Sequence, residues 1–208
     1  MNNLEEKMFD FMYQLALKDA IQQKAFKGKK KHLIENNDSK NLLKQFVDNL
    51  LNGNIKENEF DEKFKELLGG VEKSFEMKQG EKQGKFTFGN TQKLVNMTIK
   101  YVYLTTYKTP KTREYFKNCH CPMDRIMKNK VWKELKKKVK TLSNQNQKGE
   151  GQALIKKIKN DKKNYDKAWS QVQSIDDQQY KLFQEAVRFL ADLEKITPLE
   201  YDYAVWGT

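Results

Sequence analysis

Apolar side chains recur every three or four residues through most of this chain, a spacing that places them on one face of an α-helix. The clearest case is 123–142, where an apolar face lies opposite a lysine face. The sequence therefore predicts an all-α protein, with residues 1–208 forming a single globular domain of about seven or eight helices. Four expected helices span 4–24, 60–75, 123–142 and 153–169. Three more are marked by their ends: one is capped by Asp38 or Ser39 and ends at Gly53, one opens with Ser174 and Asp177, and one begins with Thr197 and Pro198. Residues 111–118 form a short helix or a loop.

The segment 86–107 supports two interpretations. Val95, Met97 and Ile99 alternate with polar residues as in a strand, yet another subset of the same residues marks one helical face. The run exceeds twenty residues without an internal turn signal. We favour a buried central helix near 90–107.

Two polar stretches interrupt the helical pattern. Residues 78–85 are punctuated by glycine, and residues 143–152 are a low-complexity run of Ser, Asn, Gln and Gly. Both are predicted to be mobile loops.

The composition excludes several classes of protein. No run approaches the roughly 18 consecutive apolar residues of a membrane span, and no signal peptide is visible. Two cysteines one residue apart cannot cross-link distant parts of a chain of this length, which excludes a secreted disulfide scaffold. We expect a reduced, cytoplasmic protein without a membrane partner.

The net charge of +12 is concentrated in one part of the chain. Residues 111–170 hold 18 basic and 6 acidic groups, which equals the whole excess. Concentrated positive charge attracts polyanions by long-range steering and counterion release. The segment therefore predicts binding to nucleic acid.

The type of basic residue limits how sequence-specific such binding can be. Only Arg113, Arg125 and Arg188 are arginines, and all other basic residues are lysines. Lysine is a point charge that lacks the fork with which arginine reads guanine, so we expect sequence-tolerant contact with the DNA or RNA backbone. An AT-rich coding bias is an alternative source of lysine. The candidate phosphate contacts are Lys130, Lys133, Lys137, Lys140, Lys156, Lys157, Lys159, Lys162 and Lys163.

The run Cys119-His120-Cys121 offers three adjacent metal ligands, but they point in divergent directions. We predict no metal site and no cofactor, and instead a turn that places Pro122 at the first position of the next helix. His120 and Asp124 could alternatively serve as a general base and its orienting carboxylate, with Lys93 as a third catalytic group.

Polar residues also interrupt the apolar segment that contains Lys93. Gln92, Asn96 and Lys100 recur at helical spacing, and buried polar groups need partners. They form either a structural hydrogen-bond network or the wall of a pocket.

Two motifs resemble a loosely defined set of uncharacterised bacterial and phage helical proteins. The first runs from Phe88-Gly89 through Gln92-Lys93 and Asn96 to Lys100-Tyr101, and the second is His120-x-Pro122-x-Asp124. The resemblance implies a bacterial or phage origin and implies no activity.

The leading hypothesis is therefore a nucleic-acid-binding helical protein. One alternative is a protein-interaction or inhibitor module that docks on an acidic protein. Another is an enzyme acting on nucleic acid or nucleotides through His120 and Asp124. The sequence leaves the oligomeric state and the choice between DNA and RNA open.

Overall fold

The computed structural model describes residues 3–21, 36–76, 86–106, 109–165, 172 and 174–206. Every regular element among them is a helix, which confirms the all-α prediction. None of these helices is both long and apolar enough to cross a membrane. The chain divides into two compact units, Met1–Asn118 and Cys119–Thr208, here called the N-terminal and C-terminal units. The expectation of a single domain stays a prediction.

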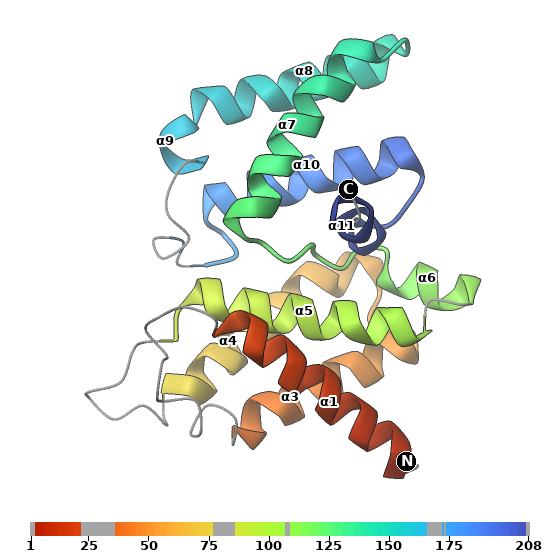
Figure 1. The fold of residues 1–208 in the computed structure, drawn as a ribbon, viewed down its shortest axis with the longest axis vertical. Coiled ribbons are helices and arrows are strands. Elements are labelled where there is room, and N and C mark those ends of the chain that lie inside the picture. The colour runs from red at the N-terminus through yellow and green to blue at the C-terminus, as the bar shows by residue number, and fades with distance from the viewer. Residues whose placement is uncertain are drawn as a thin grey trace. The chain divides into compact units, whose positions relative to one another are not determined.

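The N-terminal unit is built around α5 (Phe88–Thr106), which contacts α1, α3, α4 and α6. More than half of the α5 residues are buried, and α1 lies along it (Figure 1). The prediction of a buried central helix rather than a strand is confirmed. The surrounding helices are α1 (Asn3–Ala20), α3 (Asn37–Leu51), α4 (Phe60–Glu76), preceded by the short η2 (Glu57–Glu59), and α6 (Pro110–Phe116).

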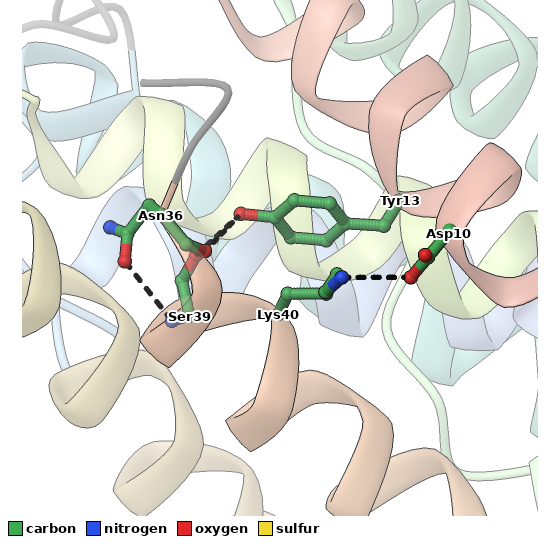
Figure 2. Close-up of polar contacts among 5 residues, drawn as sticks. All are labelled: Asp10, Tyr13, Asn36, Ser39 and Lys40. Atoms are coloured by element: carbon green, nitrogen blue, oxygen red, sulfur yellow. Dashed lines mark hydrogen bonds and ion pairs between the residues drawn. The ribbon is translucent and has the colours of Figure 1, made fainter. Parts of the chain in front are cut away.

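A buried hydrogen-bond chain ties the start of α3 to α1 (Figure 2). The Tyr13 hydroxyl of α1 bonds the Ser39 Oγ, which in turn donates to the Asn36 carbonyl at 3.1 Å. Asn36 caps α3, since its side chain accepts from the Ser39 amide at 3.3 Å, and its Nδ2 donates to Ser74 of α4 at 3.3 Å. An outer ion pair, Lys40 with Asp10 at 3.0 Å, joins the same two helices as Tyr13 and Ser39. The predicted cap at Asp38 or Ser39 was therefore wrong by two or three residues.

The C-terminal unit is organised around α10 (Gln178–Glu194), which contacts α7, α8, α9 and α11. Figure 1 shows that α8 and α9 follow α7 and that the chain reverses its direction between α7 and α8. A helix begins at Pro198, as Thr197 and Pro198 predicted. Thr197 and Glu200 form a reciprocal cap there: the Thr197 amide donates to Glu200 Oε2 at 2.7 Å, and the Glu200 amide donates to Thr197 Oγ1 at 3.2 Å. The other helices are α7 (Arg125–Thr141), α8 (Gln145–Asn160), α9 (Lys162–Tyr165) and α11 (Pro198–Trp206).

The predicted loop at 143–152 was wrong, because α8 already begins at Gln145. The Asn144 side chain accepts hydrogen bonds from the amides of Asn146 and Gln147 and so caps the helix. Gly151 is buried against α7 and α10, which adds tertiary packing to a segment of low helix propensity. The other predicted loop, 78–85, lies outside the described residues.

Two glycines of α8 form a matched pair for testing this packing. At Gly151 an added Cβ would collide with Val139 Cγ2 and come within 2.8 Å of Phe189 Cζ, whereas at Gly149 it would meet nothing within 4 Å. We expect Gly151→Ala to lower the free energy of unfolding by about 1–3 kcal/mol through overpacking. Gly149→Ala should raise it by about 1 kcal/mol through helix propensity. Urea unfolding followed by circular dichroism measures both, and equal effects of the two variants would contradict the close approach.

The Tyr13 contact predicts a pH-dependent stability. Burial raises the pKa of Tyr13 to about 12, so its neutral form stabilises the fold fully below pH 10 and less as the pH rises from 10 to 12. We expect Tyr13→Phe to lower the free energy of unfolding by about 1 kcal/mol at pH 7, because the hydrogen bond to Ser39 is lost. Above pH 10 the difference from the native protein should narrow, since phenylalanine cannot ionise.

Ser39→Ala is the control for that measurement. It removes the same hydrogen bond but keeps the titrating tyrosine, so its loss of stability should persist above pH 10. If both variants follow the same pH dependence in urea unfolding, the buried Tyr13 is not the source of the alkaline change.

Candidate functional site

His120 is held by α10 through both of its ring nitrogens. The residue is 4% exposed, its Nε2 lies 3.0 Å from Arg188 Nη2, and its Nδ1 lies 2.8 Å from the Tyr180 hydroxyl. A guanidinium can only donate, so Nε2 accepts and Nδ1 carries the ring proton that is donated to Tyr180. The imidazole is therefore fixed as one neutral tautomer inside the C-terminal unit.

The neighbouring backbone is held by a third residue of α10. The Gln184 carboxamide donates to the Cys121 carbonyl at 2.9 Å and accepts from the Cys121 amide at 3.1 Å. Tyr180, Gln184 and Arg188 are four residues apart and so lie on one face of the helix. We call these three residues with His120 and Cys121 the clasp, because they anchor the segment before α7 onto α10.

Asp124 caps the start of α7. Its Oδ1 accepts from the Met127 amide at 2.8 Å, which makes Asp124 the N-cap. The first helical residue is Arg125, so the prediction of Pro122 at that position was wrong. Pro122 instead lies in the extended segment that the clasp anchors. A catalytic role for His120 and Asp124 stays a prediction.

The two cysteines are free and buried. Burial raises the pKa of the Cys119 thiol well above its usual range, which favours the neutral thiol over the nucleophilic thiolate. Within the described residues no group of three or more His, Cys, Asp or Glu side chains could hold a metal ion.

The remaining members of the predicted site lie on α5, in the N-terminal unit. Gln92 donates to the Gly89 carbonyl at 3.0 Å and accepts from Asn96 Nδ2 at 3.2 Å, so these residues form a hydrogen-bonded run along their own helix. Lys100 is buried and Lys93 is half-buried. His120 belongs to the C-terminal unit, so a site shared by His120 and the α5 residues stays a prediction.

The lysines of the C-terminal unit separate into two groups. Some are used within the unit: Lys128 donates to the Tyr165 carbonyl and Lys130 to the Val205 carbonyl, each at 2.7 Å, and Lys136 lies over the Trp132 ring. Others are exposed and have neither a hydrogen-bond nor an ion-pair partner in the part of the chain that the structure describes. These exposed lysines are Lys133, Lys140, Lys156, Lys159 and Lys162.

Two predicted contacts are exposed but paired. Lys157 lies 3.2 Å from Glu185, and Lys137 lies 3.8 Å from Glu134. Surface ion pairs of this kind are weak and exchange readily, so both ammonium groups remain available to a phosphate. The side chain of Lys163 lies outside the described residues.

A groove of about 560 Å³ opens between α7, α10 and α11. One wall is the lysine face of α7, with Lys130, Lys133, Lys137 and Lys138. The rest of the lining is mainly apolar and comes from the other two helices and the turn between them. It consists of Leu190, Ile196, Tyr201, Ala204 and Val205, with the carboxylates Glu134 and Glu194 beside the lysines.

The groove is positive on balance. Lys138 contacts Glu194, which neutralises that carboxylate, and Glu134 lies near Lys137. Burial, and then the nearby Glu134 carboxylate, raises the pKa of Tyr201, so its hydroxyl adds no negative charge. Within the described residues Lys133 has no carboxylate partner, whereas Lys130 donates to the Val205 carbonyl at the end of α11.

Sequence reasoning predicted the lysine wall but not the apolar lining. The start of α11 was readable from Thr197 and Pro198, but its packing against α7 depends on tertiary contacts such as Lys130 with Val205. No local pattern indicates that contact.

The clasp predicts a structural rather than a chemical role for Gln184. We expect Gln184→Ala to lower the free energy of unfolding by about 2–4 kcal/mol, since the buried amide and carbonyl of Cys121 both lose their partner. Gln178→Ala, at the exposed first residue of the same helix, is the matched control and should change stability by less than about 0.5 kcal/mol. Thermal and urea unfolding measure both variants; similar stabilities would contradict the clasp.

No protein-family model, no curated protein and no solved structure matches this chain. The resemblance to bacterial and phage helical proteins therefore stays a prediction, and the function has to be argued from the site itself.

Proposed function

We propose that the C-terminal unit binds the backbone of nucleic acid through the exposed lysines of α7 and α8. The observation that carries the proposal is the lysine stripe of α7, in which Lys133, Lys137 and Lys140 follow one another at helical spacing and are all exposed. Glu134 is the one acidic residue of that helix, against Arg125 and seven lysines. The local field is strongly positive, and a polyanion is the chemical class that it attracts.

The type of contact follows from the side chains. Lysine contacts phosphate as a point charge, and the arginines Arg125 and Arg188 do not line the groove beside the stripe. We expect binding that tolerates any base sequence and weakens steeply with salt, because counterions are released when phosphates are neutralised. DNA and RNA both present this backbone.

The two alternatives make different demands on the same unit. An acidic protein partner would use the same lysines, so it is separated from nucleic acid by a titration with each. An enzyme acting through His120 would need that imidazole to reach a substrate, and in the structure the ring is buried and bonded to Tyr180 and Arg188. The observed geometry therefore supports backbone binding better than catalysis.

A cytoplasmic location and a bacterial or phage origin belong to the same proposal. Free, buried cysteines fit a reducing compartment, where nucleic acid is also found.

The proposal is tested by titrating duplex and single-stranded DNA and RNA at several salt concentrations. We expect tight binding at about 50 mM salt and a linear fall of log K with log salt. Replacing Lys133 and Lys140 with alanine should reduce the slope by about 2, one unit for each lost phosphate contact, with little dependence on base sequence.

The matched control is a double replacement in the N-terminal unit. Lys56 and Lys73 are also exposed, and their replacement with alanine removes the same charge. This variant should keep the salt slope of the native protein. Equal slopes for both double variants would mean that binding depends on the total positive charge of the protein and not on Lys133 and Lys140. No binding at low salt would refute the proposal.

A further inference from the structure

The groove between α7, α10 and α11 has a property that phosphate binding does not require. A surface that contacts only phosphates needs cations, yet this groove carries an apolar floor opposite its lysine wall. Leu190, Tyr201 and Val205 are buried beneath it, whereas Ile196 is half-buried and Ala204 is exposed. The combination calls for a ligand that is anionic on one side and apolar on the other.

The charge of the lining indicates that the ligand is negatively charged. Four lysines face two carboxylates, and the carboxylates already have lysine neighbours. Lys133 is exposed and has no polar partner within the described residues. The wall can therefore accept further negative charge at Lys133 without displacing an existing pair.

The size of the groove fits a small ligand or a short part of a chain. A volume of about 560 Å³ lies within the range of roughly 300–1,000 Å³ that is typical of ligand pockets. That volume exceeds the needs of a single phosphate group and suits a nucleotide with its base. The base of a nucleotide is flat and largely apolar on its faces, and its phosphate carries the negative charge.

We infer that this groove binds unpaired nucleotides, so that the C-terminal unit prefers single-stranded nucleic acid over duplex. The inference rests on the proposed function and specifies its substrate. In a duplex the base faces are stacked inside the helix, and a duplex would leave the apolar floor of the groove empty. In a single strand the bases are free to contact Tyr201, Ile196 and Val205 while the phosphates contact Lys133 and Lys137.

The decisive probe is an oligonucleotide that lacks its bases. Fluorescence anisotropy with the full chain would compare three probes of about ten nucleotides: an oligothymidylate, an abasic strand with the same number of phosphates, and a duplex. If the floor contacts bases, the oligothymidylate should bind about tenfold tighter than the abasic strand at equal salt, since each stacked base contributes on that scale. The duplex should bind more weakly than the oligothymidylate at equal phosphate concentration.

Ala204 offers a specific variant, because it is an exposed residue of the lining. Ala204→Glu places a carboxylate over the floor and should abolish the preference for the oligothymidylate over the abasic strand. Ala204→Gln fills the same space without charge and should reduce that preference. Ala153→Glu, at an exposed position of α8, is the control: it should weaken both strands equally and leave their ratio unchanged.

The outcomes separate this inference from the function on which it rests. Equal affinity for the oligothymidylate and the abasic strand would overturn the inference and leave backbone binding in place. An unchanged preference in Ala204→Glu would also overturn it, by placing the base contact elsewhere. If none of the three probes binds at about 50 mM salt, backbone binding itself fails.

Discussion

The packing of the C-terminal unit depends on how the buried polar side chains of α10 find hydrogen-bond partners. Helix α10 is contacted by four other helices, and it buries Gln179, Tyr180 and Gln184 among its apolar residues. A buried polar group without a partner costs about 1–3 kcal/mol, so each of these side chains constrains what can pack against it. Tyr180 and Gln184 meet that need by bonding His120 and the backbone of Cys121. The anchored segment leads directly into Asp124, the cap of α7, and so fixes where the lysine helix begins.

The same unit shows that a net charge measured on the sequence overstates the charge that is free to bind. Lys128 is buried against Tyr165, Lys130 caps the end of α11, and Lys138 contacts Glu194. These lysines hold helices together. The ammonium groups left over for an external anion are fewer, but they have fixed positions on α7 and α8. The position of a lysine on its helix therefore matters more for function than its presence in the basic segment.

The sequence predicted the fold well where the signal is local. The three-to-four spacing of apolar residues identified α5 and α7, and the pair Thr197 and Pro198 identified the start of α11. The loop prediction at 143–152 failed because its evidence was composition alone, whereas Asn144 supplies a cap and Gly151 allows a close contact with Val139.

The candidate site was only half predictable, for a related reason. The lysine stripe of α7, Lys133, Lys137 and Lys140, follows from helical spacing. The apolar floor comes from Leu190, Ile196 and Val205, which lie fifty or more residues later in the chain and look like ordinary core residues. The bonds of His120 to Tyr180 and Arg188, over 60 and 68 residues, are likewise tertiary and leave no local pattern.

Gln184 has a consequence for recognising related chains. Its carboxamide donates to the carbonyl and accepts from the amide of the same residue, Cys121, as a neighbouring strand does in a sheet. Glutamate has no donor for the carbonyl, and asparagine is one methylene shorter, so few residues can stand in for it. A distant relative that keeps this anchor should show His-Cys-Pro followed about 60 residues later by Tyr-x-x-x-Gln-x-x-x-Arg, even where its surface lysines have changed. That spaced signature, rather than overall similarity, is the means by which such a relative could be found.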